Sequence, residues 1–298
     1  MNNASNSPRI GFIGLGLMGY AMVSRLQDKG YSLTVLGNRS RTNIEAAVKR
    51  GAREAENAKE LAAASDIVMI CVDRSENVEA RMRGEEGVLS GVKKGCVVID
   101  FGTSLPESSI ALGKEALERG VFYLDAPLGR TPAHAEKGEL NIMASGDKAA
   151  YEKVLPVLND LGENVFHLGK LGSGNTIKLF NNFLGMATAN ATAEIYAMAD
   201  RAGIDRKLVY QVIAAGPLHS GMMDFISRYA LENDNSALAF SVKNAAKDVS
   251  YYLQTTKALN ANSNLAGTIS TSMNGALDDG YGPKHVCEMM DYYISLKD

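Results

Sequence analysis

The stretch that decides the fold lies near the start of the chain, where residues 9–19 read RIGFIGLGLMG. An apolar run typical of a buried strand leads directly into glycines spaced as GxGxxG, and a helix is expected after them. Such glycines let the backbone approach a pyrophosphate, to which the start of the helix offers unpaired N–H groups. The alternative is a glycine-rich turn that only tightens strand-to-helix packing. We favour a dinucleotide loop, made of Gly14, Leu15, Gly16, Leu17, Met18 and Gly19.

From this loop to Leu168 the chain alternates short β-branched runs with longer amphipathic segments. The expected strands are Arg9–Gly14, Ser32–Leu36, Ile67–Val72, Val97–Asp100, Phe122–Asp125, Asn141–Ser145 and Val165–His167. The expected helices are Met18–Lys29, Thr42–Arg50, Ala58–Ala64, Pro106–Arg119 and Lys148–Leu161. This alternation is typical of strands joined by crossover helices. It predicts an α/β Rossmann domain over residues 1–168, with a doubly wound, mostly parallel sheet.

The strand pattern stops after Leu168, and Gly169, Gly172 and Gly174 lead into segments rich in Ala and Met. This pattern predicts an all-α domain over residues 169–298, entered by a long helix from about Thr176 to Ala202. Further helices are expected at Arg206–Ala214, Gly221–Tyr229, Phe240–Thr256, Leu265–Asp279 and Val286–Leu296.

The composition narrows the class of protein. The 298 residues suffice for two domains, and a hydrophobic share of 46% with 22% charged residues is typical of a globular chain. A formal net charge of -3 gives no excess of basic residues for nucleic acid. Cys71, Cys96 and Cys287 are too few and too far apart for a disulfide framework or a zinc site, so no metal is expected. Without a signal segment or a long apolar run, we predict a cytoplasmic protein with no membrane partner.

The choice between NAD(H) and NADP(H) depends on residues 37–41, about 20 residues beyond the glycine loop, where NAD-binding domains usually carry an Asp or Glu. This stretch reads GNRSR and contains no carboxylate. Asn38, Arg39 and Ser40 are suited instead to a 2′-phosphate, which arginine binds by charge-assisted hydrogen bonds. We therefore expect NADP(H), with NAD(H) as the alternative if these arginines are only solvated loop charges.

A candidate reacting centre lies at the start of the long helix, where Lys178 and Asn182 are spaced to share one face. Apolar neighbours lower the pKa of a lysine by desolvation, which suits it to pass a proton to a developing alkoxide. Asn182 is placed to orient the same oxygen. The alternative is a lysine that extends to solvent and an asparagine with a structural role, which spacing alone favours.

Taken together, these motifs resemble the β-hydroxyacid dehydrogenases related to 3-hydroxyisobutyrate dehydrogenase, over nearly the whole chain. GFIGLGLMG resembles the cofactor loop of that family, and DFGT at 100–103 resembles its segment beside the nicotinamide, with Thr103 as the matching residue. DAPLGRT at 125–131 occupies the place of its substrate motif, and GSGNTIKLFNN at 172–182 that of its catalytic motif. Lys247, in the sequence KDV, resembles the late KDL signature.

The resemblance implies hydride transfer between a nicotinamide and the hydroxyl-bearing carbon of a short acid, with Lys178 as proton donor or acceptor. It also implies that Val72, Thr103 and Lys247 contact the cofactor and that Asn182 and Phe240 contact the substrate. The family pattern further implies an active site between the two domains and assembly as a homodimer or homotetramer. Lys178 argues against the related imine reductases, which resemble this chain but carry Tyr or Asp at that position.

One departure from the family bears on the substrate. The usual motif DAPVSGG becomes DAPLGRT, so that Gly129, Arg130 and Thr131 replace Ser-Gly-Gly. A guanidinium and a hydroxyl offer several donors to a carboxylate or a sulfonate. Gly-Arg-Thr is similar to the motif of the sulfolactaldehyde and succinic semialdehyde reductase branch. The resemblance implies NAD(H) for that branch, which carries an acidic residue at the position where this chain has Asn38. The alternative role for Arg130 is a structural ion pair with Asp125 or Glu136.

The sequence therefore predicts an NADP(H)-dependent oxidoreductase that interconverts a short β- or γ-hydroxyacid and its aldehyde or semialdehyde. An NAD(H)-dependent 3-hydroxyisobutyrate-type or sulfolactaldehyde reductase is the nearest alternative. A non-catalytic Rossmann protein that senses dinucleotide is an alternative from another class, and Lys178 separates the two because only the enzyme needs it for turnover. A methyltransferase is disfavoured by the all-helical second half.

Overall fold

The computed structural model describes residues 7–37 and 41–296. The chain forms two compact units, Met1–Lys178 and Leu179–Asp298, each with its own hydrophobic core. Unit 1 extends past the domain boundary expected at Leu168 and takes in the start of the long helix. The predicted fold class is confirmed, because a mostly parallel α/β unit is followed by a helical one.

Unit 1 is built on a nine-stranded sheet, counted over the described residues. Its strands are β1 (Ile10–Ile13), β2 (Leu33–Leu36), β3 (Arg53–Glu54), β4 (Ile67–Ile70), β5 (Val97–Asp100), β6 (Phe122–Asp125), β7 (Leu128–Gly129), β8 (Leu140–Gly146) and β9 (Gly162–His167). The strand order is β3-β2-β1-β4-β5-β6-β8-β7, with β9 paired to β8. The first six strands are parallel and follow the 3-2-1-4-5-6 order of a Rossmann sheet, whereas β8 runs antiparallel to β6 and β7.

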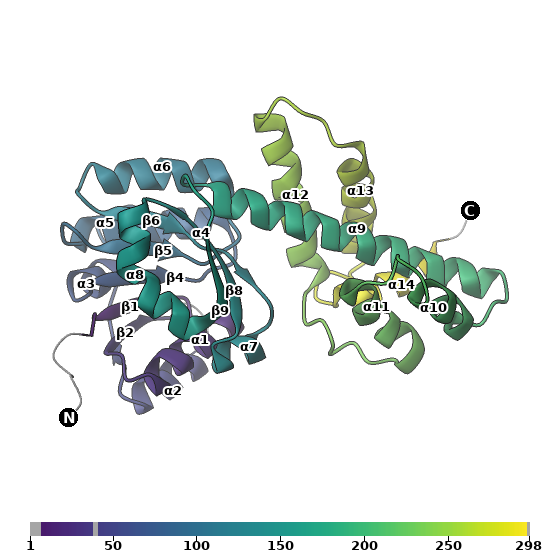
Figure 1. Ribbon diagram of the computed structural model, residues 1–298, viewed down its shortest axis with the longest axis horizontal. Helices are drawn as coiled ribbons and strands as arrows, with labels where there is room; N and C mark the ends of the chain where they lie inside the picture. Colours follow the sequence, from purple (N-terminus) through teal and green to yellow (C-terminus); the bar gives the residue numbers. More distant parts are fainter. Residues whose placement is uncertain (1–6, 38–40, 297–298) are drawn as a thin grey trace. The chain divides into compact units, whose positions relative to one another are not determined.

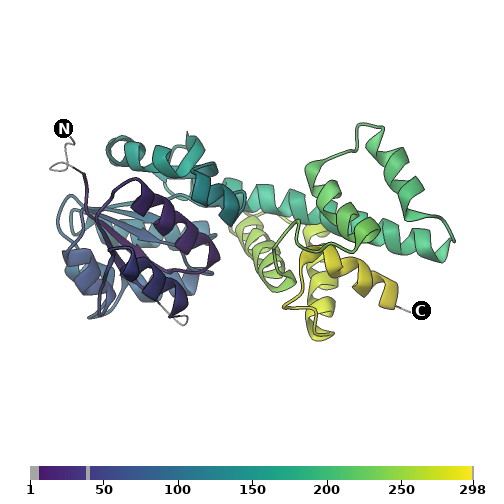
Figure 2. The same cartoon turned by 90° about the horizontal axis from the view of Figure 1, so that it is seen from below.

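Helices cover both faces of this sheet (Figures 1 and 2). Those whose apolar residues share a core on one face are α1 (Leu17–Asp28), α2 (Thr42–Lys49), α7 (Pro132–Lys137) and α8 (Lys148–Leu161). Those on the other face are α3 (Ala58–Ala63), α4 (Ser75–Met82), α5 (Val88–Gly91) and α6 (Pro106–Leu117). Because the parallel strands are buried on both faces, their sequences are continuous apolar runs instead of alternating ones.

Unit 2 is helical throughout its described part. Its elements are α9 (Ser173–Arg201), which begins in unit 1, α10 (Arg206–Ala214), α11 (Gly221–Glu232), α12 (Val242–Ala258), α13 (Asn264–Asp278), the 3₁₀ turn η1 (Val286–Glu288) and α14 (Met289–Ser295). Buried residues of every one of these except α10 meet in one core, and the partly buried Val209 of α10 packs against it. None of the helices that the structure describes is long and apolar enough to cross a membrane.

The expected elements are present, although some begin or end at other residues than expected. One helix begins where a capping residue stands. The helix expected to start at Phe240 starts at Val242, because the Ser241 hydroxyl accepts from the N–H of Asn244 and caps it. The strands β3 and β7 and the helices α4, α5 and α7 were not expected. These elements are two to eight residues long, too short to show a clear hydrophobic period.

Candidate functional site

The glycine loop joins β1 to α1 at the carboxyl edge of the parallel strands. Gly14 has φ +94°, which favours glycine, and a Cβ there would clash with the carbonyl oxygen of Cys71. A Cβ on Gly19 would clash with the carbonyl oxygen of Gly14, so this residue allows the helix to lie close against the loop. A Cβ on Gly16 would meet no atom within 4 Å. The loop is therefore tightly packed on the protein side and open at Gly16.

This open position lies at the N-terminus of α1. Gly16 is the N-cap of α1, and no side chain there accepts from the first N–H groups of the helix. The Asn43 amide fixes the loop from behind by donating to the carbonyl oxygen of Leu15 at 2.8 Å. Val72 lies beside Gly14, while Leu17 is exposed. A dinucleotide pyrophosphate fits this cradle, since free N–H groups and a helix dipole both favour an anion.

The residues expected at the adenosine ribose, Asn38, Arg39 and Ser40, lie outside the described part of the chain. Their neighbour Arg41 is described and pairs with Glu54, with nitrogen-to-oxygen distances of 2.6 and 2.9 Å. This pair is exposed on the surface of unit 1.

Thr103 lies in the loop that follows β5, and buried hydrogen bonds hold this loop on both sides of it. The Asp100 carboxylate accepts from the Gly102 N–H at 2.8 Å and from the Ser104 hydroxyl at 2.8 Å. Burial raises the pKa of Asp100 to about 6, although these two hydrogen bonds act in the opposite direction. Thr103 itself is half-buried and makes contacts of its own.

Lys178 is half-buried on α9, in the part of the helix that belongs to unit 1. The helix begins against the sheet, where the Asp125 carboxylate at the end of β6 accepts from the N–H of Gly172 at 2.8 Å and of Asn175 at 2.7 Å. Asp125 pairs in register with Asp100 on β5. The start of α9 and the loop that carries Thr103 are therefore anchored to neighbouring strands of one sheet.

The Gly129-Arg130-Thr131 segment begins at the end of β7 and has an unusual conformation. Arg130 has φ 76°, a left-handed conformation that is strained for a side chain other than glycine. Its guanidinium is ion-paired with Glu163 and donates to the carbonyl oxygen of Glu139 at 2.6 Å, whereas Asp125 and Glu136 are not its partners. The Thr131 hydroxyl lies 2.8 Å from His134 Nδ1.

The remaining expected residues lie in unit 2, where Asn182 and Lys247 form a cluster with Asp248. The Asn182 amide donates to one oxygen of the Asp248 carboxylate at 2.6 Å, and Lys247 Nζ lies 3.0 Å from the other oxygen. Lys247 Nζ also lies 5.1 Å from the centre of the Tyr251 ring. Asp248 is buried, so its charge is balanced by Lys247. Phe240 lies apart, in the segment before α12, half-buried against the core of unit 2.

The expected residues are thus distributed over the two units. Unit 1 holds the glycine loop, Val72, Thr103, Lys178 and the Gly129-Arg130-Thr131 segment, and unit 2 holds Asn182, Phe240 and Lys247. Sequence reasoning missed the roles of Asp100, Asp125 and Asn175 as anchors. The available signal was that two predicted apolar strands each ended in an aspartate, which is rarely buried without partners.

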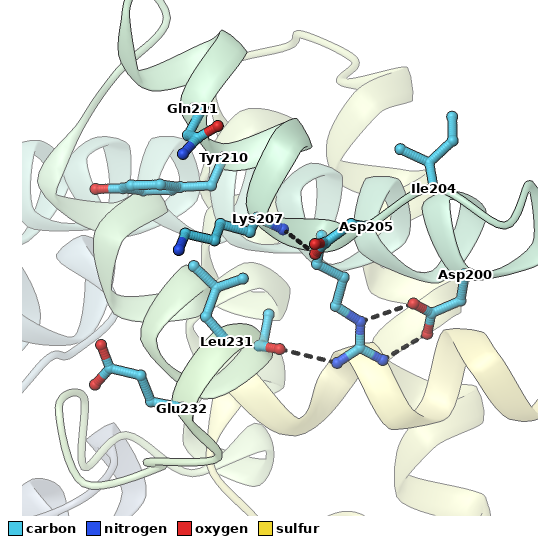
Figure 3. Close-up of a pocket in the computed structure, with 10 residues that line it drawn as sticks. Asp200, Ile204, Asp205, Lys207, Tyr210, Gln211, Leu231 and Glu232 are labelled. Carbon is cyan, nitrogen blue, oxygen red and sulfur yellow. Dashed lines mark hydrogen bonds and ion pairs between the residues drawn. The ribbon is translucent and has the colours of Figure 1, made fainter.

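A separate cavity of about 720 Å³ lies in unit 2 and contains none of the expected residues. Figure 3 shows Lys207, Tyr210 and Gln211 of α10 on one side, with Leu231 and Glu232 of α11 opposite. Its arginine, Arg206, is held by Asp200 and by the carbonyl oxygen of Ala230. Among the residues that the structure describes, no three His, Cys, Asp or Glu side chains converge as a metal site would require.

Two family models cover almost the whole chain. The model described as the NAD binding domain of 6-phosphogluconate dehydrogenase matches residues 9–169. The model described as the NAD-binding of NADP-dependent 3-hydroxyisobutyrate dehydrogenase matches residues 172–293. The boundary between the two matches falls just before α9.

Known proteins resemble the chain over most of its length. It is 32% identical to the 2-(hydroxymethyl)glutarate dehydrogenase of Eubacterium barkeri, over 84% of this chain and 83% of that protein. It is 31% identical to the 2-hydroxy-3-oxopropionate reductase of Escherichia coli, over 85% of this chain and 86% of that protein. The crystal structure of a 3-hydroxyisobutyrate dehydrogenase from Salmonella typhimurium superposes with a TM-score of 0.84, at 26% identity, covering 95% of this chain and 99% of the other.

These matches confirm the resemblance seen in the sequence motifs and the predicted enzyme class. The glycine loop, the Rossmann strand order and the helical second unit agree with them. The chain belongs to the β-hydroxyacid dehydrogenase family and is an NAD(P)-dependent oxidoreductase.

Proposed function

We propose that the chain is an NADP(H)-dependent reductase of short aldehydes or semialdehydes that bear a carboxylate or sulfonate, and that it also oxidises the corresponding hydroxyacids. The observation that most supports this is the anchoring of Lys178 and Thr103. The helix that carries Lys178 is hydrogen-bonded to the loop that carries Thr103, at the same sheet edge as the glycine loop. In open α/β sheets, ligands bind outside the carboxyl ends of the strands, which is where these residues lie.

Lys178 acts in this proposal as the general acid and base. When bound, the nicotinamide supplies or accepts the hydride at the carbon that bears the oxygen. In reduction, Lys178 Nζ donates a proton to the oxygen as it gains negative charge, and in oxidation it removes the proton from the hydroxyl. Asn182 hydrogen-bonds to the same oxygen. Its amide orientation is set by Asp248, to which Asn182 Nδ2 donates.

The Gly129-Arg130-Thr131 segment binds the anionic end of the substrate in this proposal. Arg130 pairs with Glu163, whose side chain is exposed. Exposed ion pairs contribute only about 0–1 kcal/mol, so a substrate anion displaces Glu163 at little cost. The E. coli relative is a 2-hydroxy-3-oxopropionate reductase, and its name agrees with a short acid as substrate.

NADP(H) is the proposed cofactor because residues 37–41 contain two arginines and no carboxylate. Arg39 and Ser40 are proposed to bind the 2′-phosphate, with Asn38 beside the ribose. Val72 and Lys247 complete the proposed cofactor contacts. The enzyme is also proposed to assemble as a homodimer or homotetramer, as the family pattern implies.

The test is the loss of NADPH absorbance, with NADH in parallel, over a panel of short aldehydes from tartronate semialdehyde to sulfolactaldehyde. We expect turnover with NADPH, and we expect Lys178→Ala to abolish it while leaving the Kd for NADPH close to that of the wild type. Unchanged turnover in Lys178→Ala would overturn the mechanism. A preference for NADH would overturn the roles of Arg39 and Ser40, and silence with every aldehyde would favour a dinucleotide sensor.

A further inference from the structure

Asn175 lies at the centre of a buried polar network in unit 1. Its side chain is 0% exposed. Asn175 Oδ1 accepts from the backbone N–H of Ser104 at 2.9 Å, and Asn175 Nδ2 donates to the Ser109 hydroxyl at 3.2 Å. Both serines are buried as well. An amide with an acceptor and a donor each satisfied in a dry site has one fixed orientation.

The network joins two segments that are far apart in the sequence. Ser104 directly follows Thr103 in the loop after β5, and Asn175 lies in the first turn of α9, about one turn before Lys178. Residues three apart on a helix project from neighbouring positions on the same side. The hydrogen bond between Ser104 and Asn175 therefore ties the Thr103 segment to the turn that precedes Lys178.

Further bonds make both ends of this tie rigid. Ser104 is fixed a second time because its hydroxyl donates to Asp100. The first turn of α9 is held down by Asp125 and by Ser145, whose hydroxyl donates to Asp125 and accepts from the Gly174 N–H at 2.9 Å. A Cβ on Gly174 would clash with the carbonyl oxygen of Met143, so the helix approaches the sheet as closely as backbone permits.

We infer that Asn175 is a positioning residue, which sets the placement of Lys178 relative to the loop that carries Thr103. This inference rests on the proposed function of Lys178. Asn175 itself touches neither substrate nor cofactor in this assignment, and acts through the helix and the loop. A displacement of about 1 Å at a reacting group can lower the rate by about 100-fold, which gives the expected size of the effect.

The experiment compares Asn175→Ala with Ser109→Ala. The first variant removes both bonds and leaves the Ser104 N–H unpaired, whereas the second removes a hydroxyl from the same network and keeps the bond to Ser104. The readouts are kcat per folded molecule, the Kd for NADPH by fluorescence titration, and the isotope effect with NADPH deuterated at the transferred position of C4. For Asn175→Ala we expect kcat to fall by about 100-fold, a nearly unchanged Kd and a larger isotope effect. Ser109→Ala should keep a kcat close to that of the wild type.

A third variant, Asn175→Asp, tests whether a conservative substitution preserves kcat. It also replaces Asn175→Ala in the comparison if the alanine variant does not fold. Its carboxyl group has the same shape, keeps an oxygen for the Ser104 N–H and, when protonated, also a donor toward Ser109. It should retain much more of kcat than the alanine variant, because it keeps the bond from the Ser104 N–H that the alanine variant loses. Equal kcat in all folded variants, or a loss that follows only the unfolding temperature, would overturn the inference. Failure of the proposed function is distinguished by Lys178→Ala, whose activity would then persist.

Discussion

Asp248 links Asn182 and Lys247 in the cluster of unit 2. Its two oxygens bind different partners, Asn182 and Lys247, and it is buried. A buried carboxylate requires partners for its charge, so it holds the two polar groups in fixed positions. In the proposed function, its loss therefore affects substrate and cofactor contacts together.

We predict that Asp248→Asn lowers kcat/KM by about 10- to 100-fold, since a hydrogen bond to a charged group contributes about 1.5–3 kcal/mol. The amide introduced by this substitution would still accept from one partner but would leave the Lys247 ammonium without its carboxylate. Steady-state kinetics with NADPH and the best aldehyde give the measurement. Asp278→Asn, which removes an exposed carboxylate at the end of α13 that is not a member of this cluster, is the matched control. Equal kcat/KM values in the two variants would contradict a role for Asp248.

Asp100 makes the free energy of unfolding depend on pH. Its pKa is raised from the ordinary 3.8 to about 6, first because of burial. The folded chain thus keeps this proton up to a higher pH than the unfolded chain, so folding stability falls as pH rises from about 4 to 6. The difference corresponds to about 3 kcal/mol at neutral pH. Asp125 acts in the same direction, because burial raises its pKa too.

Asp100→Asn should remove this share of the pH dependence. An amide of the same shape still accepts from the Gly102 N–H and can donate to the Ser104 hydroxyl, so the loop keeps its bonds. Urea unfolding at a series of pH values from 4 to 7 gives the measurement, and the stability of the variant relative to the wild type should rise over this range by up to about 3 kcal/mol. Profiles of equal slope would show that the carboxyl of Asp100 does not titrate in this range.

At the scale of elements, two glycines in the turn from β1 to α1 have different surroundings, so one substitution tests binding and the other tests packing. A Cβ on Gly16 meets no atom within 4 Å, whereas one on Gly19 clashes with backbone. We predict that Gly16→Ala leaves the unfolding temperature nearly unchanged but weakens NADPH binding by about tenfold or more, equal to about 1.4 kcal/mol. Gly19→Ala should lower the unfolding temperature, because overpacking costs about 1–3 kcal/mol.

Thermal unfolding and isothermal titration of both variants check this pair. The prediction fails if Gly16→Ala binds NADPH as tightly as the wild type, since the open side of the loop would then not face the pyrophosphate. It also fails if Gly16→Ala is as unstable as Gly19→Ala. The two substitutions add the same methyl group, toward open space at Gly16 and toward backbone at Gly19.

Elements with a strong local pattern could be predicted from the sequence, and contacts between distant segments could not. The strands β5 and β6 have the bounds that were expected, because each is a short apolar run ending in Asp. Strand β7 has two residues and leaves no such pattern. The glycine loop is likewise a local motif. The side chain of Asn175 bonds to residues that are 66 and 71 positions away in the sequence. A hydrophobic period describes only neighbouring residues, so it could not predict these bonds.

At the scale of the whole molecule, the chain consists of two units with separate cores. The glycine loop lies wholly in unit 1, so the dinucleotide stabilises that unit directly. A ligand at 100 times its Kd adds about 2.7 kcal/mol to the unfolding free energy of the form that binds it. The strands that flank the loop, β1 and β4, are the places where this gain should be visible.

We therefore predict that NADPH slows amide hydrogen exchange in β1 and β4, and that this effect is smaller in Gly16→Ala at the same NADPH concentration. The amides of α13 report on unit 2, and they should gain protection to the extent that the two units unfold together or that the proposed Lys247 contact stabilises unit 2. Exchange measured by mass spectrometry, with and without NADPH, resolves both units in one experiment. No added protection in β1 and β4 at saturating NADPH would place the dinucleotide elsewhere. Undiminished protection in Gly16→Ala would leave the binding site at this sheet edge but move the pyrophosphate away from Gly16, because the added methyl group would then lie outside its path.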